Sequence, residues 1–382
     1  MAFIRLEVSD FRNLLSVKLE PVYQGINLFY GHNGSGKTSF LEAIYYLSLG
    51  RSFRSAKIDR IINNNSEKFS LFANSLTIHN QKISVGIERE HNTDIKIRLA
   101  GKDIHSIAEL ASLSPILLIN SHCHHFLDAG PVFRRKYLDW GAFYYTNDFL
   151  RLWREFQRAL KQRNAALRSN TSKKELETWS NELIHRAILL HQFRKDYIHQ
   201  LLPLLLETIA ELVPLPGLEI SYQSGWNESL DYQQALAQSL ERDMQLGYTQ
   251  LGPHRADLKV TVNGVPAKDI LSRGQQKLFV CAMILTQGAL LHRSANKRPI
   301  YLIDDLPSEL DLMSRSKLMA LLSKQEAQVF VTAVDREILK DFLIQSPFKV
   351  FHVEHGEISE VDFVSTPRIE EMAFNNCIEI VE

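Results

Sequence analysis

Hydrophobic and polar positions alternate along the start of the chain and predict a β-strand over residues 3–9, with Ile4, Leu6 and Val8 on one side and Phe3, Arg5 and Glu7 on the other. A second short strand, over residues 26–30, runs directly into a glycine-rich loop. The residues after this loop have a helical period that places Phe40, Ala43, Ile44 and Leu47 on one face, and Gly50 is in position to end the helix. The chain therefore begins with a strand, a glycine loop and a helix.

The rest of the chain divides into regions of different pattern. Short alternating runs over residues 69–99 predict antiparallel strands joined by hairpin turns, whereas residues 133–213 have long helical periods. A return to mixed structure is then marked by Pro203, Pro214, Pro216 and Gly217. Beyond it we expect a helix between Ile270 and His292, and strands over residues 258–264, 299–304, 329–334 and 349–358.

This order predicts an α/β protein whose main domain has a mixed sheet built from both chain ends and is interrupted by an inserted helical domain. We place the N-terminal part of the main domain at residues 1–121, the inserted helical domain at 122–246, the C-terminal part at 247–365 and a mildly acidic tail at 366–382. A chain of 382 residues is long enough for two or three domains of roughly 100–200 residues each.

Composition narrows the class of protein. Apolar residues at 45% and charged residues at 23% are typical of a folded, soluble protein. The 44 basic residues balance 44 acidic ones, so any DNA site must be a local patch. Three cysteines without paired spacing fit a reducing compartment. Neither a signal-peptide pattern nor an apolar stretch of roughly 20 residues is present, so we expect a cytoplasmic protein with no membrane partner.

The glycine loop over residues 31–38 has the eight-residue pattern of a phosphate-binding loop. Glycines let successive backbone amides turn toward phosphate oxygens, and the start of the following helix adds a positive dipole. Lys37 would reach the β and γ phosphates of ATP, and Thr38 would help to hold Mg²⁺. We therefore predict an ATP site that includes Gly31, His32, Asn33, Gly34, Ser35, Gly36, Lys37, Thr38 and Ser39.

The other half of such a site should be a buried strand that ends in carboxylates. The apolar run from Ile300 to Ile303 leads directly into Asp304 and Asp305. We expect Asp304 to hold Mg²⁺ through water and Asp305 to orient the attacking water as a general base, so Lys37 and Asp305 are the expected catalytic residues. The alternative is a solvated strand end with no catalytic role.

Two further motifs complete a recognisable set. LSRGQQK, residues 271–277, opens a predicted helix, and SELD, residues 308–311, follows the carboxylates. The set and its order resemble the ATP-binding-cassette superfamily, in which an LSGGQ-like signature of one subunit closes on the nucleotide of another. In that resemblance Ser272, Gly274 and Gln275 meet the γ phosphate in trans. Ser272 also suits a helix N-cap, and both roles can hold together because the capping amides form an anion site.

Several segments resemble the RecF family, a DNA-repair branch of this superfamily. Arg273 replaces the first glycine of the transporter signature, and five runs lie in the family's order: DFRN, GRSFR, DAGPVFRRKYLDWG, LKQRNAALR and YTQLGPHRADL. The resemblance adds Arg12 and Asn13 of DFRN to the expected nucleotide site. The chain departs from the family or the superfamily at two places. Asn120, Ser121 and His122 stand where the family has a Pro-Glu or similar pair, and Thr332 stands near the place of the transporter switch histidine, so we expect Thr332 to sense the γ phosphate.

The resemblance implies an ATPase of recombinational repair, replication restart and the SOS response. An ATP-dependent homodimer would grip gapped or junction DNA, hydrolysis would release it, and RecR and RecO would cooperate in loading RecA. The resemblance also implies a weak, DNA-stimulated ATPase. Asp305 is one methylene shorter than the glutamate common in transporters, so we expect slow turnover.

Residues 148–168 combine a basic and an aromatic face at helical spacing. The basic face carries Arg151, Arg154, Arg158, Lys161 and Arg168, and the opposite face carries Phe149, Trp153, Phe156, Leu160 and Leu167. Residues 122–200 contain fourteen Lys or Arg against eight Asp or Glu, so this region is basic within a neutral chain. We expect the basic face to contact DNA phosphates, the alternative being a solvated amphipathic helix.

Two smaller clusters have simpler interpretations. Arg54, Lys57 and Arg60 form a second basic cluster that would either bind DNA or pack as a loop. The run from His122 to His125, with Cys123, suggests a metal site. Adjacent residues cannot all face one ion, however, and no paired cysteines follow, so we expect no zinc site.

Three other classes of protein are alternatives. The ATPase subunit of a membrane transporter would carry a glycine-rich LSGGQ, a switch histidine and a shorter helical insert. A structural chromosome protein of the SMC type would need sustained heptads, but only 232 residues separate Thr38 from Leu271. A scaffold that senses ATP without hydrolysing it would keep its function in Asp305→Asn.

Overall fold

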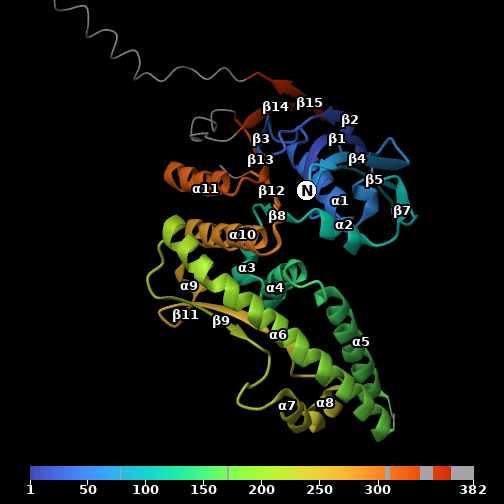
Figure 1. Ribbon diagram of the computed structural model, residues 1–382, viewed down its shortest axis with the longest axis vertical. Helices are drawn as coiled ribbons and strands as arrows, with labels where there is room; N and C mark the ends of the chain where they lie inside the picture. The colour runs from blue at the N-terminus through green and yellow to red at the C-terminus, as the bar shows by residue number, and fades with distance from the viewer. Residues whose placement is uncertain (78, 170–171, 306–309, 336–346, 363–382) are drawn as a thin grey trace, which may run out of the picture.

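The computed structural model describes residues 1–77, 79–169, 172–305, 310–335 and 347–362. Figure 1 shows two six-stranded sheets at one end of the molecule, a layer of helices beneath them and a helical arm at the other end. The expected α/β class with a mixed sheet is confirmed.

The central sheet joins the two ends of the chain. Its order is β15-β14-β3-β13-β12-β8, formed by Glu357–Val361, Phe348–Glu354, Gly25–Tyr30, Gln328–Ala333, Ile300–Ile303 and Ile116–Ile119. All neighbouring pairs are parallel except β14 and β15. Strand β3, which leads into the phosphate loop, therefore pairs only with strands from the second half of the chain.

The second sheet is antiparallel and comes entirely from the N-terminal third. Its order is β2-β1-β4-β5-β6-β7, formed by Leu14–Leu19, Ala2–Phe11, Lys68–Leu76, Lys82–Glu90, Lys96–Leu99 and Lys102–Ile104. The prediction for β1 is confirmed for Leu6 and Val8 but wrong for its first residues, since Phe3 is buried and Ile4 is only partly buried. The reason is a shift in the pairing of β1 with β4 between Phe3 and Arg5, which changes the face that each residue presents.

Helix α1 (Lys37–Leu49) fills the space between the two sheets. The four apolar residues predicted for its inner face are buried, and Gly50 ends the helix in the left-handed conformation, with φ 60°. The central strands alternate as a sheet buried on both faces requires. Phe29 packs with α1 and the second sheet, whereas Leu28 packs with the helical layer on the other side.

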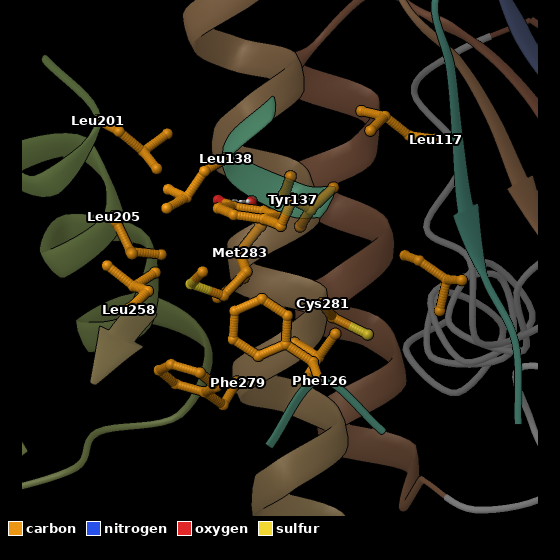
Figure 2. Packing of buried hydrophobic residues seen from close by; sticks show 14 of the residues in the cluster. Leu117, Phe126, Tyr137, Leu138, Leu201, Leu205, Leu258, Phe279, Cys281 and Met283 are labelled. Atoms are coloured by element: carbon orange, nitrogen blue, oxygen red, sulfur yellow. Dashed lines mark hydrogen bonds between the residues drawn. The ribbon is translucent and has the colours of Figure 1, made fainter. Parts of the chain in front are cut away.

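The helical layer is organised around α10 (Arg273–Ala295), which packs with α4 (Pro131–Tyr145), α6 (Lys173–Leu212) and α11 (Leu312–Lys324). Figure 2 shows residues of α3 (His125–Asp128), α4, α6, α10 and β10 (Asp257–Val262) meeting in this core. In length and composition α10 would suffice to cross a membrane, which the sequence analysis did not anticipate, but 67% of its apolar window is buried inside the fold. Short α2 (Ile107–Leu113) lies beside α1.

The arm consists of the long helices α5 (Phe149–Arg168) and α6, with α7 (Tyr232–Gln238) and α8 (Leu240–Leu246) at its tip. A three-stranded sheet accompanies it, formed by β9 (Leu218–Gln223), β10 and β11 (Val265–Pro266), with α9 (Ala267–Ile270) after it. The helical region predicted to reach residue 213 is confirmed by the end of α6 at Leu212, but Pro203 lies inside this helix and does not mark the return to mixed structure. Burial of Leu201 and Leu205 on either side of the proline holds the helix together despite the missing N–H donor.

Candidate nucleotide-binding site

The predicted motifs meet at one edge of the central sheet. Strands β3, β12 and β8 lead directly into Gly31, Asp304 and Asn120. Thr332 lies one residue before the end of β13, and these four strands are parallel. The backbone N–H of Asp304 donates to the carbonyl of Ile119 at 2.8 Å, which fixes the end of β12 against β8. In sheets of this kind, ligands bind at the carboxyl ends of the strands.

The loop between β3 and α1 has the features of an anion site. The first N–H groups of α1 have no side-chain cap. The Ser35 hydroxyl is buried and has no hydrogen-bond partner among the described residues. The Lys37 ammonium donates to the carbonyls of Gly31 at 2.6 Å and His32 at 2.8 Å, so it closes the loop from within. These uncapped and unpaired groups fit the phosphates of a nucleotide.

Two hydroxyl groups and a carboxylate are linked by hydrogen bonds next to this loop. Thr38 Oγ1 donates to Asp304 Oδ1 at 2.9 Å, and Thr332 Oγ1 donates to the same oxygen at 2.8 Å. The Thr332 hydroxyl also accepts from the backbone N–H of Asp305 at 2.9 Å. A hydroxyl and a carboxylate at this distance are hard oxygen ligands of the kind that Mg²⁺ prefers, so Thr38 and Asp304 fit the expected metal role.

The ionisable groups of the site influence one another. Burial lowers the pKa of Lys37, and the carboxylates of Asp305 and Asp304 oppose this effect. Burial raises the pKa of Asp304, and the donated hydrogen bonds from Thr332 and Thr38 oppose that. Asp305 is exposed and has a left-handed backbone conformation, with φ 53°, which is sparsely populated by residues other than glycine and is frequent at functional sites.

The turn between β14 and β15 supports the phosphate loop from outside, which the sequence analysis missed. The N–H of Gly356 donates to the carbonyl of Ser35 at 2.8 Å. Asn13 joins the loop from a third direction, donating to the Gly34 carbonyl at 3.3 Å and accepting from Ser39 Oγ at 2.8 Å. Nothing in the local pattern around residue 356 indicates this contact, because it depends on chain segments more than 300 residues apart.

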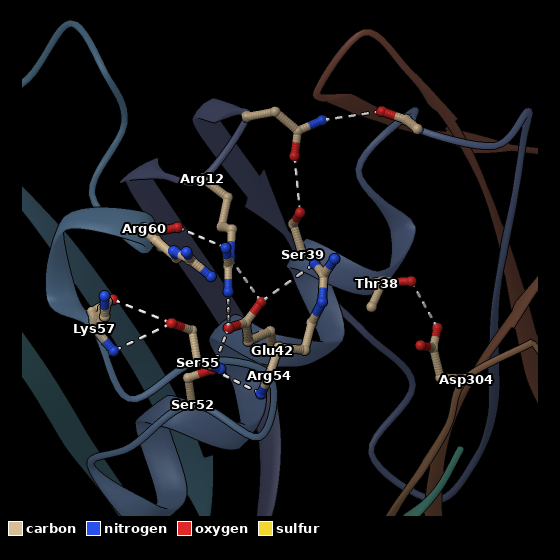
Figure 3. A network of polar contacts seen from close by, with 12 residues as sticks. Arg12, Thr38, Ser39, Glu42, Ser52, Arg54, Ser55, Lys57, Arg60 and Asp304 are labelled. Carbon is tan, nitrogen blue, oxygen red and sulfur yellow. Dashed lines mark hydrogen bonds and ion pairs between the residues drawn. The ribbon is translucent and has the colours of Figure 1, made fainter. Parts of the chain in front are cut away.

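Arg12 lies in a second network beside the loop, shown in Figure 3. Its guanidinium makes a bidentate pair with the fully buried Glu42, at 2.7 and 2.9 Å, and also donates to the Arg60 carbonyl at 2.6 Å. Arg54 lies 3.5 Å from the same carboxylate, and Ser52 donates to it. Of the basic cluster, the Arg54 side chain contacts Glu42 and the Arg60 carbonyl accepts from Arg12, but the side chains of Arg54, Lys57 and Arg60 are all exposed, so both interpretations of this cluster stay open. Nothing in the sequence pattern singled out Glu42.

The signature residues are not part of this constellation. Ser272 is exposed at the start of α10 and forms a capping box with Gln275, as the N-cap alternative requires. A Cβ added at Gly274 would meet no atom within 4 Å, so packing within the chain does not require glycine there. Among the described residues, Ser272 and Gln275 form hydrogen bonds with each other and none with the phosphate loop. In SELD, residues 308 and 309 lie outside the described residues, and Asp311 caps α11.

The predicted basic stripe lies along α5, at the outer side of the arm. All five of its basic side chains are exposed, and Phe149, Phe156 and Leu167 on the opposite face are buried. Arg151 pairs with Asp148 at 3.0 Å, and Arg168 donates to the Gly247 carbonyl at 3.2 Å. Within the described parts of the chain, Arg154, Arg158 and Lys161 have no ion-pair partner.

The segment after β8 gathers a different set of groups. One ligand atom each of His124, His125 and Asp128 lie within 4.8 Å of one another. The run of histidines was visible in the sequence, whereas Asp128 joins the group only because the short helix α3 brings it to the same side.

Comparisons with known proteins agree with this geometry. The family described as the RecF/RecN/SMC N-terminal domain matches residues 2–359. The DNA replication and repair protein RecF of Shewanella pealeana is 42% identical over 362 residues, which is 95% of this chain and 100% of the relative. The chain belongs to the RecF family. The RecF protein of Shewanella denitrificans, 41% identical over the same shares of both chains, agrees.

Solved RecF structures share the whole architecture. Two structures of the recombination mediator protein RecF in the RecFOR pathway, one with ATP and one with ATPrS, have TM-scores of 0.82 and 0.81 and 25% identity, and each covers 94% of this chain and 98% of its own. An Smc head bound to the C-terminal winged-helix domain of ScpA has a TM-score of 0.59 at 13% identity, with 98% of this chain and 100% of that one covered, and shows the fold alone. The resemblance to RecF is thus confirmed.

Proposed function

We propose that this chain is an ATP-controlled DNA clamp of recombinational repair. The observation that supports the proposal most is that the nucleotide-binding motifs of one chain lie in two separate places. The phosphate loop, Thr38 and Asp304 form one half of a nucleotide site, while Ser272 is exposed at the cap of α10 and Gly274 is partly exposed with no neighbour that requires a glycine. Two copies arranged head to tail would supply both halves twice and enclose two nucleotides.

Each residue has a role that follows from its position. The amides of the loop and the Lys37 ammonium would hold the β and γ phosphates, with Arg12 and Asn13 supporting the loop. Thr38 and Asp304 would bind Mg²⁺, which neutralises charge on the phosphates. Asp305 would orient the attacking water, and Thr332, which contacts both aspartates, would report the γ phosphate to them. Hydrolysis would be weak, stimulated by DNA and slow.

The DNA partner is proposed on two grounds. Relatives of this chain are named DNA replication and repair proteins, and the arm presents exposed basic side chains without ion-pair partners in the described structure. The preferred substrate would be gapped DNA or a junction of single and double strands. RecR and RecO would assist in loading RecA, in keeping with the RecFOR pathway named for the similar structures.

The test is the solution mass by light scattering, with and without ATP and a gapped duplex. We expect ATP to double the mass of the protein on DNA. We expect Ser272→Arg to remain monomeric, because the arginine side chain would obstruct the phosphate-binding loop of the partner subunit. Ser172→Arg is a matched control, since Ser172 caps α6 in the same way but lies in the arm. Dimers that persist in Ser272→Arg would refute the in-trans role.

Nucleotide binding is tested separately with Lys37→Met. We expect this change to abolish ATP binding, because it removes a charge-assisted contact that contributes about 1.5–3 kcal/mol and leaves the loop carbonyls without their donor. Titration of a fluorescent ATP analogue measures the effect, and the exposed Lys18→Met provides the control. Normal ATP affinity in Lys37→Met would contradict the assignment of the phosphate loop as the ATP site.

Family membership sets aside a transporter subunit, and an ATP-sensing scaffold is the second candidate function. The exposure of Asp305 favours it, because a general base works best in a closed site. Asp305→Asn distinguishes the two: a clamp should bind ATP and DNA but fail to release, whereas a scaffold should be unaffected.

A further inference from the structure

A compact group of metal-ligating side chains follows strand β8, away from the phosphate loop motifs in sequence. His124 and His125 stand at the start of α3 and Asp128 at its end, and one ligand atom of each lies within 4.8 Å of the other two. His124 and Asp128 are four residues apart, which places them on one side of a helical turn. Among the residues that the structure describes, this is the one such group of three.

The orientation of His124 is already suited to a metal. Its Nδ1 lies 2.8 Å from the carbonyl oxygen of Ser121, and because a carbonyl can only accept, Nδ1 must donate. In the neutral ring the lone pair is therefore on Nε2. A histidine that binds a metal through one nitrogen and donates from the other to a backbone carbonyl is the usual arrangement in metal sites.

The other members of the group complete a plausible ligand set. His125 Nδ1 lies 3.3 Å from Asp128 Oδ1, so the imidazole and the carboxylate already face each other. The ring of His122 is parallel to that of His125, with centroids 5.6 Å apart, and adds a third imidazole as a fourth ligand at the same surface. His124 and His125 are only partly exposed, which limits their freedom to turn away from the group.

We propose that His124, His125 and Asp128 bind one divalent transition-metal ion of the zinc class, with His122 or water as the fourth ligand. Imidazole nitrogens with one carboxylate suit Zn²⁺, Ni²⁺ or Co²⁺ and not Mg²⁺, which prefers oxygen ligands alone. Zinc bonds of about 2.0–2.2 Å draw the three ligand atoms closer than 4.8 Å, which rotation of these surface side chains allows. The site is independent of the proposed ATPase activity.

Asp128 connects this site to the signature. Its Oδ2 lies 3.8 Å from Arg273 Nη1, at the first residue of α10. A bound dication would take over the carboxylate and repel the guanidinium, so metal binding and the Asp128–Arg273 pair oppose each other. Arg273→Ala removes the guanidinium, so this change should strengthen metal binding several-fold. A site that merely stabilised the fold would give no such gain.

The experiment is a titration of the metal-free full chain with Co²⁺ and Zn²⁺, followed by the visible absorption of Co²⁺ and by competition with a chromophoric chelator. We expect one ion per chain, and a loss of affinity of at least about 100-fold in His124→Ala and in Asp128→Asn, since even partners beyond the ligands contribute about 10- to 100-fold. Circular dichroism checks that both variants fold.

Three controls separate this site from other metal binding. The exposed His79→Ala and His105→Ala should bind normally, and Asp304→Asn, which alters the expected Mg²⁺ position, should also keep the zinc-class ion. The proposal is overturned if no stoichiometric ion binds. It is equally overturned if His124→Ala and Asp128→Asn bind as the native chain does, or if the His79 and His105 controls lose the same affinity.

Discussion

At the scale of single residues, the nucleotide site divides into groups that a local pattern indicates and groups that it does not. The phosphate loop and the paired aspartates are short runs next to predictable elements, so their neighbourhood could be anticipated from the sequence. Gly356 and Glu42 could not, because each acquires its partner from a distant segment. A residue whose function is to hold another segment in place leaves no motif of its own.

Gly356 provides a residue-scale prediction about the phosphate loop. Its φ is 85°, and an added Cβ would lie 2.1 Å from the carbonyl oxygen of Asn13, so the turn or the Asn13 segment must move. Because Asn13 and Gly356 both hold the loop, we expect Gly356→Ala to weaken ATP binding by at least about tenfold, or about 1.4 kcal/mol. Titration with a fluorescent ATP analogue measures the change.

The control for this variant has the same backbone strain without the collision. Gly264 has φ 81° and nothing within 4 Å of an added Cβ, so Gly264→Ala should lose a similar amount of stability to strain but keep its ATP affinity. Equal ATP affinity in the two variants would show that the turn has no influence on the loop.

At the scale of elements, periodicity predicted the helices and strands well where one face is buried. Periodicity failed at the start of the strand at residues 3–9, and the turn signal of Pro203 was wrong, because this residue lies inside α6. In the strand, a bulge changed the face on which Phe3 lies. In the helix, tertiary burial outweighed the cost of the proline. Neither effect can be read from a short stretch of sequence. The packing at the tip of the arm was also unpredicted, since it depends on a buried polar network.

That network joins the helices of the arm to the segment before β10. Arg163, which is fully buried, donates to Asp243 at 2.8 Å and to Thr249 Oγ1 at 2.6 Å. His254 donates from Nε2 to the Thr249 carbonyl at 3.0 Å, and its Nδ1 is buried without a partner in the described structure. The two contacts of Arg163 join residues 80 and 86 apart in the chain, which explains why no spacing indicated them.

His254 predicts how the stability of the protein depends on pH. Burial lowers the pKa of His254 to about 4 from an ordinary 6.5, although its bond to Thr249 opposes the shift. As the pH falls below 6.5, the unfolded chain takes up a proton that the folded protein refuses. Stability contributed by the neutral ring is therefore lost between pH 6.5 and about 4, by up to about 3 kcal/mol.

Denaturant unfolding at several pH values checks this prediction. His254→Gln retains a donor for the Thr249 carbonyl but does not titrate, so its free energy of unfolding should fall less between about pH 7 and pH 4.5 than that of the native chain. The exposed His79→Gln should follow the native curve. Parallel curves for all three proteins would contradict the assignment.

At the scale of the whole molecule, the α/β class with a mixed sheet from both chain ends was predictable from the order of motifs. The order in which strands from the two chain ends lie in that sheet was not predictable, because strand order is set by long-range pairing. The same limit applies to DNA binding. The sequence predicts the basic stripe on α5, but the electrostatic field of the whole molecule decides whether DNA binds there.

The stripe predicts a specific dependence on salt. We expect the triple change of Arg154, Arg158 and Lys161 to alanine to weaken binding to DNA of any sequence and to reduce the slope of log affinity against log salt by about three. The matched control replaces three exposed lysines elsewhere, Lys82, Lys102 and Lys259. An unchanged slope in the stripe variant, or an equal reduction in the control, would assign the DNA interface to another surface.

The pairing of β3 has a consequence for how the protein is made. Its neighbours, β13 and β14, comprise residues 328–333 and 348–354, and the turn that holds the phosphate loop contains Gly356. Nearly the whole chain must therefore leave the ribosome before the loop is held in place, and a nascent fragment has the motif without the site. Translation that stops early produces a polypeptide unable to capture nucleotide, so truncated copies should not compete with complete ones for their partners.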